Sequence, residues 1–362
     1  MTKQILEELR KSLDEIDGKL IKLLDNRTEI VRKIGKAKQE AGIETSFAPI
    51  RESELFGHLR SAKLKNLDKT ALENIFLEIV SSSRAIQDDG RVCVLGEPDG
   101  WFNDAAISRF GTSARISADE NFEDFYQTVA ANHANIGFAS FTPEHSPDMM
   151  LLIQKLFSGK LSIVEEFNYS PEFSVVTNTA RDLSEVHELC ITGEILKLMR
   201  HFLVSLSYDL KIKICRSMAE VHESLRSVNP VGAILPAKLV ESLTDRIVVK
   251  NGLKSESLNR VKFLSLSATP AYDFAPGLKT MLLFPVTHAN NEHWYDIITG
   301  MRQHKINIAG IHSLICAEKP WDTILIIELL LPEKYEIFEL LLKEFEAKNL
   351  MVRCCGFYPV FK

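Results

Sequence analysis

The stretch from residue 3 to residue 41 reads KQILEELRKSLDEIDGKLIKLLDNRTEIVRKIGKAKQEA. Its apolar residues recur every three or four positions, which is typical of one face of a helix. The members of this stripe are Leu6, Leu9, Leu13, Ile16, Leu20, Leu23, Ile30, Ile34 and Ala37. Two glycines but no proline interrupt the stretch. At 1.5 Å per residue the helix would be on the order of 60 Å long, so it needs packing partners along its length.

Cations stand on this face where the spacing calls for apolar residues. Position 27 of the stripe is Arg27, and Lys38 follows eleven residues later, within about 20° of the same azimuth and roughly 16 Å along the axis. Arg10 lies about 25 Å from Arg27 along the same helix, too far for both to hold one small anion. If Arg10 shares that site, it comes from another chain. The alternative is that these side chains reach solvent or pair with carboxylates.

Two shorter helices are expected to follow. A helix that begins with a proline would carry Arg51 and Glu52 in its first turn. A third helix is predicted from about residue 68 to residue 87. Ser83 and Gln87 are four residues apart, so they share one face near the end of that helix.

Residues 3–88 resemble the all-helical chorismate mutase domain, a three-helix intertwined homodimer. The resemblance rests on LRKSLDEIDGKLIKLLDNR with KIGKAK, on FAPIRESE and on IFLEIVSSSRAIQ, in that order. The family's ligand-binding positions fall on Arg10, Arg27, Lys38, Arg51, Glu52, Ser83 and Gln87. The chain differs at Ala48, where some members carry aspartate, and it has one extra residue between Lys38 and Arg51.

The resemblance implies the rearrangement of chorismate, a dicarboxylate, to prephenate without a covalent intermediate, a cofactor or a metal. Arg27 and the partner chain's Arg10 would hold the carboxylates. Lys38 and Gln87 would donate hydrogen bonds to the ether oxygen, where negative charge grows in the transition state. Glu52 would hold the substrate hydroxyl. Confining the flexible substrate in its reactive form supplies the orientation part of the catalysis.

From residue 91 short apolar runs alternate with helical segments, which predicts two α/β lobes around a cleft. Their order and length resemble prephenate dehydratase, whose two lobes are similar to periplasmic binding proteins. That family's LGPxG, ENS, serine-threonine-alanine and TRF motifs correspond to LGEPDGW at 95–101, PEHS at 143–146, SMAE at 217–220 and VKF at 261–263.

Several reactive positions of that family are changed. Val261 replaces a threonine that assists loss of the prephenate hydroxyl, and Lys262 replaces an arginine, which removes the bidentate fork. Trp101 and Met218 replace smaller polar residues. Because general acid catalysis is worth roughly 10²–10⁴-fold, we expect a weak or inactive dehydratase. The residues left to form a dehydratase-like site are Glu144, His145, Ser217 and Lys262.

The last segment, after a linker near residues 271–277, shows the order strand, helix, strand, strand, helix, strand. This α+β order is ferredoxin-like and resembles the ACT regulatory domain. Trp294 and Leu314 stand where that family grips phenylalanine, so a structural or dimerising role is favoured. The predicted domains are 1–90, 91–270 and 278–362.

The composition excludes some classes of protein. The chain is 45% hydrophobic with a net charge of −6, so no overall positive field recruits nucleic acid or a membrane. Six cysteines without a CxxC pair suggest buried thiols in a reducing compartment. Because no apolar run resembles a signal peptide or a membrane span, a cytoplasmic protein is expected.

The order of the three regions resembles the bifunctional P-protein of phenylalanine biosynthesis. The first hypothesis is a chorismate mutase, at least dimeric, whose dehydratase-like domain has a degraded site. A second is a fully bifunctional enzyme that also binds prephenate and makes phenylpyruvate. A third is that residues 91–362 form a metabolite-sensing or partner-binding module that controls the mutase.

Overall fold

The computed structural model describes most of the chain, and the statements below concern these residues. They are 2–42, 47–88, 90–98, 100–131, 133–142, 148–206, 210–241, 243, 246–254, 260–268, 274–286, 292–316 and 319–361.

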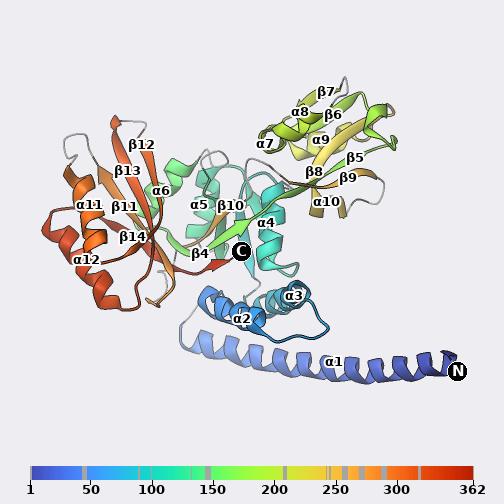
Figure 1. Cartoon of the computed structure of the whole chain (residues 1–362), viewed down its shortest axis with the longest axis horizontal. Helices are drawn as coiled ribbons and strands as arrows, with labels where there is room; N and C mark the ends of the chain where they lie inside the picture. Colours follow the sequence, from blue (N-terminus) through green and yellow to red (C-terminus); the bar gives the residue numbers. More distant parts are fainter. Residues whose placement is uncertain are drawn as a thin grey trace.

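Three helices form the N-terminal part, as the apolar spacing predicted. They are α1 (Thr2–Glu40), α2 (Pro49–Ser61) and α3 (Lys69–Asp88). Figure 1 shows the N-terminal half of α1 extending beyond α2 and α3. On this half Leu9, Leu13 and Leu20 are each more than half exposed, at 62%, 56% and 52%. The apolar stripe that requires packing partners is therefore uncovered in a single chain.

The middle of the chain forms two α/β lobes, which confirms the two-lobed expectation. The first lobe has a six-stranded sheet, called sheet A, in the order β15-β4-β10-β3-β1-β2. Its strands are β1 (Arg91–Leu95), β2 (Arg115–Asp119), β3 (Ile136–Ser140), β4 (Ser162–Tyr169), β10 (Val261–Ser267) and β15 (Val360–Phe361). Its helices are α4 (Trp101–Phe110), α5 (Phe122–Ala130) and α6 (Met149–Phe157). Phe138 of β3 and Phe263 of β10 stack at 4.7 Å between ring centroids in its core.

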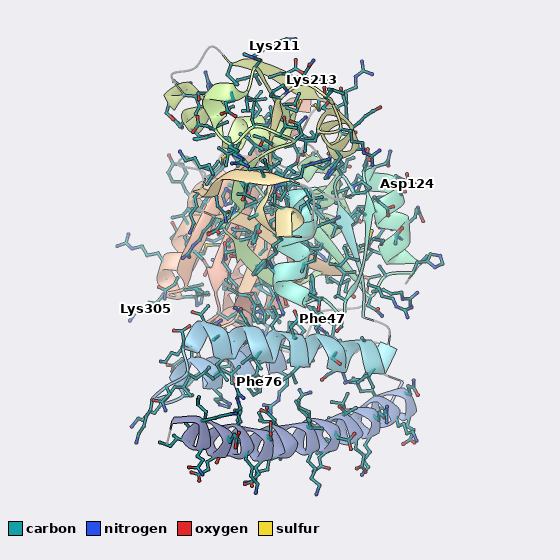
Figure 2. The ribbon with its side chains drawn as sticks, turned by 90° about the vertical axis from the view of Figure 1, so that its right-hand side faces the viewer. Phe47, Phe76, Asp124, Lys211, Lys213 and Lys305 are labelled. Carbon is teal, nitrogen blue, oxygen red and sulfur yellow. The ribbon has the colours of Figure 1, made fainter. Side chains whose placement is uncertain are left out.

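The second lobe has a five-stranded sheet, called sheet B, in the order β7-β6-β8-β5-β9. Its strands are β5 (Glu172–Thr177), β6 (Glu188–Thr192), β7 (Lys211–Cys215), β8 (Val231–Pro236) and β9 (Ile247–Lys254). Its helices are α7 (Gly193–Leu198), α8 (Arg200–Ser205), α9 (Met218–Ser224) and α10 (Ala237–Glu241). The chain passes between the lobes twice, from β4 to β5 and from β9 to β10. Figure 2 shows this lobe farthest from the helices, with Lys211 and Lys213 at its end.

The C-terminal part has the predicted order of strands and helices. Its strands are β11 (Lys279–Val286), β12 (Asn307–Cys316), β13 (Lys319–Leu330) and β14 (Arg353–Tyr358), and its helices are α11 (Glu292–Gln303) and α12 (Tyr335–Ala347). They form sheet C in the order β12-β13-β11-β14.

The last strand, β15, leaves this unit. Val360 and Phe361 pair in parallel with Glu166 and Phe167 of β4. Residues 360 and 361 of the predicted third domain, 278–362, therefore belong to sheet A rather than to sheet C. So short a strand has no periodicity of its own from which to recognise it.

A buried group of charges joins sheet A to sheet C. Lys279 of β11 donates to Glu166 of β4 at 2.6 Å and also pairs with Glu328 of β13. Lys262 of β10 pairs with Glu328 as well. We call these four residues the Lys279 cluster. The Glu328 side chain is 1% exposed, so its charge depends on the two lysines for stabilisation.

The Lys279 cluster predicts a specific pH dependence of stability. Burial alone raises the pKa of Glu328, but Lys262 and Lys279 outweigh burial and hold it below the ordinary 4.5. A carboxyl with a lowered pKa in the folded state stabilises the fold above its ordinary pKa, and that stabilisation is lost as the pH falls through the folded value. Glu328→Gln should therefore cost about 3–5 kcal/mol near neutral pH, with a smaller difference from wild type below pH 4.5.

Chemical denaturation at a series of pH values measures this difference. The matched control is Glu339→Gln, because the Glu339–Lys343 pair is exposed, at 42% and 63% of the two side chains. Exposed pairs contribute little to stability. A Glu328→Gln deficit that stays constant down to pH 3 would contradict the assignment.

Candidate functional site

The contact between α1 and α3 brings two of the predicted site residues together. The Arg27 guanidinium donates a hydrogen bond to the Ser83 hydroxyl, which in turn donates to the Ile79 carbonyl at 2.6 Å. Burial lowers the pKa of Arg27. One turn farther along α1, Val31 is buried. Arg27 is therefore part of a packed helix interface rather than a solvated surface cation.

A second contact along the same face involves Gly35 and Gln87. A Cβ atom on Gly35 would lie 3.3 Å from the Cγ atom of Gln87, so glycine allows the two helices to approach closely. The Oε1 atom of Gln87 is buried and has no hydrogen-bond partner among the described residues. Buried polar atoms are normally paired, so this atom marks a place for a ligand or a water.

The packed face of α1 differs from its apolar stripe. Arg27, Val31, Gly35 and Lys38 follow one another at helical spacing, and all are buried or half-buried. The stripe residues Ile30 and Ile34 are instead exposed, at 57% and 46%. The helix thus has a polar face toward α3 and an apolar face toward solvent in one chain.

Two other predicted residues lie on the surface. Arg10 is exposed on the N-terminal half of α1, far along the helix from Arg27. The exposed Arg51 forms an ion pair with Glu54 at 2.8 Å. Neither is brought to the Arg27–Ser83 contact within one chain.

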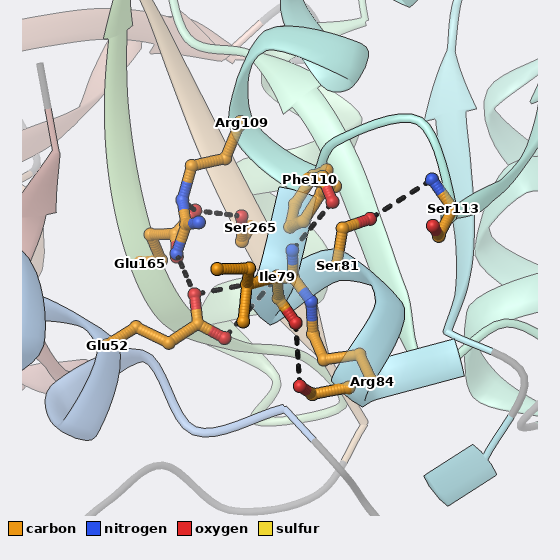
Figure 3. A network of polar contacts seen from close by, with 10 residues as sticks. Glu52, Ile79, Ser81, Arg84, Arg109, Phe110, Ser113, Glu165 and Ser265 are labelled. Atoms are coloured by element: carbon orange, nitrogen blue, oxygen red, sulfur yellow. Dashed lines mark hydrogen bonds and ion pairs between the residues drawn. The ribbon is translucent and has the colours of Figure 1, made fainter. Parts of the chain in front are cut away.

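Glu52 differs most from the sequence-based expectation that it would hold a substrate hydroxyl. Its side chain is 7% exposed, and its carboxylate accepts hydrogen bonds from Arg84 at 3.2 Å and from Arg109 of α4 at 2.9 Å (Figure 3). The reason is helical spacing, because Glu52 shares the buried face of α2 with Phe56 and Leu59. This face packs toward the α/β lobes, so both carboxylate oxygens are engaged there.

A separate cavity of about 220 Å³ lies between the two lobes. Its lining residues are Leu95, Gly96, Glu97, Phe102, Glu120, Ser140, Asp148, Glu194, Arg216 and Ser217. Two contacts cross it: Glu97 accepts from the backbone N–H of Met218, and Trp101 Nε1 donates to Glu194 at 3.2 Å. Burial raises the pKa of Glu194, with Glu97 adding to the shift and Trp101 opposing it.

Of the predicted dehydratase-like residues that the structure describes, one lines this cavity and the other lies elsewhere. Ser217 lines it and also caps α9 by accepting from the N–H of Glu220 at 3.2 Å. Lys262 belongs to the Lys279 cluster instead, because alternate residues of β10 point to opposite faces of sheet A. Glu144 and His145 lie outside the described residues.

Two further findings concern the whole described part of the chain. No group of three or more His, Cys, Asp or Glu side chains is placed there to hold a metal ion. In the same residues, no helix combines the length and the apolar character needed to cross a membrane.

Comparison with known proteins agrees with the helical site and the lobes. Residues 9–88 match the family model of chorismate mutase type II. The chorismate mutase of Methanocaldococcus jannaschii is 31% identical over 83 residues, which are 23% of this chain and 83% of the relative. The bifunctional chorismate mutase/prephenate dehydratase of Aquifex aeolicus (strain VF5) is 24% identical over 371 residues, 98% of each chain.

A solved structure shares the fold of the region after the helices. It is the prephenate dehydratase from Staphylococcus aureus subsp. aureus Mu50, with a TM-score of 0.60 and 13% identity, covering 74% of this chain and 100% of that chain. The family match thus covers the three helices, and the solved structure shares the fold of the lobes. The chain belongs to the type II chorismate mutase family through residues 9–88 and has the P-protein layout, in which a prephenate dehydratase-like region follows the mutase.

Proposed function

We propose that this protein rearranges chorismate to prephenate between α1 and α3, and that its dehydratase-like region no longer dehydrates prephenate. The observation that carries the first part is the half-buried guanidinium of Arg27, which donates to Ser83 in the α1–α3 interface beside the Gln87 side chain. Chorismate is a dicarboxylate, and a half-buried guanidinium is suited to hold one of its carboxylates.

The chemistry then follows from fixed donors. Arg27 and Gln87 share the α1–α3 interface, and the half-buried Lys38 lies on the same face of α1, so a bound substrate would meet cations and an amide at set positions. The Lys38 ammonium and the Gln87 amide N–H would donate to the ether oxygen as negative charge develops on it. The helices would also confine the substrate in its reactive conformation, which removes the entropic part of the barrier.

We infer that the mutase is a homodimer in which the partner supplies Arg10. The support is the uncovered apolar face of α1, which includes Leu9, Leu13 and Leu20. An exposed apolar surface of this length is typical of an interface, and a second copy of the chain offers the same surface. We also place the protein in the cytoplasm, because buried thiols such as Cys93 and Cys190 are free. The likeness to bifunctional chorismate mutase/prephenate dehydratases supports a place in a biosynthetic route to aromatic amino acids.

Arg27→Ala and Arg10→Ala should each lower the kcat of the mutase by about 10²–10³-fold, because each removes a fixed cation from the transition state. If the sites are shared, chains of the two variants refolded together regain activity. Half of the resulting dimers are mixed, and each mixed dimer has one intact site, so about a quarter of the wild-type activity is expected. The measurement is chorismate consumption.

The control for this experiment is Lys33→Ala, which removes an exposed α1 cation paired with Glu29. It should keep wild-type turnover. Mixed chains that stay as inactive as the separate variants would rule out the supply of Arg10 by the partner.

Gly35→Ala should lower the mutase activity without lowering the stability of the fold. Alanine in a helix interior is favoured over glycine by up to about 1 kcal/mol, so α1 should not be destabilised. The new Cβ atom would press on Gln87, and its displacement should lower kcat/KM by about tenfold or more. Thermal unfolding and mutase kinetics measure the two effects. Gly57→Ala is the control, because no atom lies within 4 Å of its Cβ; equal kinetics for both variants would contradict the prediction.

The loss of dehydration is supported by the cavity between the lobes. Four carboxylates line it, from Glu97, Glu120, Asp148 and Glu194, against the single guanidinium of Arg216. This charge balance disfavours prephenate, which is itself a dicarboxylate. Val261 is fully buried in β10 and has no proton to donate.

The wild-type protein given chorismate should therefore accumulate prephenate in equal amount, without phenylpyruvate. Chromatography of the three compounds over time measures this outcome. An active prephenate dehydratase added to a parallel sample is the positive control. Phenylpyruvate formed by the protein alone would show that dehydration is retained, and unchanged chorismate would overturn the mutase assignment.

A further inference from the structure

Helix α3 is held on two sides. One side carries Ser83 and Gln87 toward α1, and the other packs on the α/β lobe (Figure 2), where the Arg84 guanidinium of α3 donates to the carbonyl of Phe110 in α4 at 2.7 Å. Because α3 is a single rigid element, contacts on the second side determine where the site residues on the first side stand.

The second side of α3 is bound to the end of α4 and the turn that follows it. The Glu78 carboxylate accepts from the N–H of Thr112 at 3.1 Å and from its hydroxyl at 2.6 Å. The N–H of Ser113 donates to the Ser81 hydroxyl at 3.1 Å. Gly111, which directly follows α4, has φ +77°, and a Cβ there would lie 2.6 Å from the Cβ of Ser81. The turn is thus shaped to fit α3 closely.

A group of four buried charges lies deeper in the same interface, and we call it the Arg109 cluster (Figure 3). It consists of Glu52 from α2, Arg84 from α3, Arg109 from α4 and Glu165 from β4. Arg109 donates to Glu52 at 2.9 Å through Nη2 and to Glu165 at 2.8 Å through Nε. Arg84 donates to Glu52 at 3.2 Å and to the Phe110 carbonyl at 2.7 Å. Two acids and two guanidiniums balance in charge.

The cluster is well shielded from water. The side chains of Arg109 and Glu165 are 3% and 0% exposed. The ring of Phe361, in the last strand, lies 3.8 Å from the Arg109 Cζ atom and contacts Phe56 of α2 edge-on. Burial alone lowers the pKa of Arg109, but Glu165 and Glu52 outweigh burial and raise it. Arg109 therefore stays charged, and it links α2 to sheet A through its pairs with Glu52 and Glu165.

We propose that Arg109, which lies outside the mutase domain, is a positioning residue for the mutase reaction. It holds Glu52 and, through Glu52, Arg84, and so sets α2 and α3 where Ser83 and Gln87 meet Arg27. This role rests on the proposed mutase function of the α1–α3 site. Arg84 immediately follows Ser83 in α3, so a shift of Arg84 moves Ser83 with it.

The central test is Arg109→Met in the full-length protein. Without the guanidinium, Glu52 and Glu165 lose their shared partner, and α2 and α3 shift relative to α1. A misplacement of roughly 1 Å costs about 10²-fold in rate, so kcat should fall by about 10- to 100-fold while circular dichroism and oligomeric state stay unchanged. KM should change less, because Arg27 remains.

The matched control is Lys279→Met. Lys279 also bridges two buried acids, Glu166 and Glu328, but these ion pairs join sheet A to sheet C and involve no residue of the mutase helices. It should lower the melting temperature as much as Arg109→Met and leave kcat within about twofold of wild type. Arg109→Lys is a second variant that keeps the charge but cannot bridge both acids as a guanidinium does. It should fold like wild type and lie between wild type and Arg109→Met in kcat.

A double-mutant cycle tests the path through Glu52. If Arg109 acts through Glu52, adding Arg109→Met to Glu52→Gln should lower kcat little further, because the interaction is already lost. If the double variant instead loses kcat by the product of the two separate factors, Arg109 does not act through Glu52.

The remaining outcomes separate the two proposals. Wild-type kcat in both Arg109 variants would overturn the positioning role while the mutase assignment stands. Equal losses of kcat in Arg109→Met and Lys279→Met would also overturn it, by showing a general effect of destabilisation. A wild-type protein that leaves chorismate unchanged would overturn the mutase assignment itself, and the role of Arg109 with it.

Discussion

The ion pairs that Arg109 makes with Glu52 and Glu165 bring together segments that are far apart in the sequence. Buried charges of this kind are costly unless they are paired and hydrogen-bonded, so the pairs require α2, α3, α4 and β4 to stand in one arrangement. The fit of the turn after α4 against α3, with Gly111 at its centre, adds to this requirement. As a result, the helices that carry the proposed mutase site pack in a fixed position on the α/β lobe and are not connected to it by a flexible linker alone.

The sequence predicted the parts that depend on local spacing. The long helix and the placement of Ser83 and Gln87 on one face follow from the helical period. The packed face of α1 did not, because the apolar stripe with Ile30 and Ile34 is exposed while Arg27 and Lys38 are half-buried. The role of Glu52 did not follow, because its partner Arg109 is 57 residues away in the sequence and is identified only by how the lobes pack. The same spacing argument, applied to Glu52, Phe56 and Leu59, would have shown that Glu52 lies on a buried face of α2.

The two-lobed region shows how a fold can be kept while the residues that give it a chemistry change. A cavity lies between its lobes and two contacts cross it. Lys262, however, forms an ion pair that joins sheet A to sheet C, and acids line the space between the lobes. A fold of this kind supports many activities, so the residues of the site carry the functional argument. The sequence indicated which positions had changed, but the charge balance of the cavity required the structure.

The pairing of β15 with sheet A joins a strand that follows the C-terminal unit to β4, near the middle of the sequence. Strand β4 pairs with Val360 and Phe361, so this edge of the sheet stays unpaired until the strand that follows sheet C has folded back onto it. Contacts between such distant segments slow folding, and an unpaired strand edge invites association with other chains in the meantime. Closure of the first lobe thus depends on a strand that comes after the C-terminal unit in the sequence, which makes this sheet edge a late part of the molecule to become native.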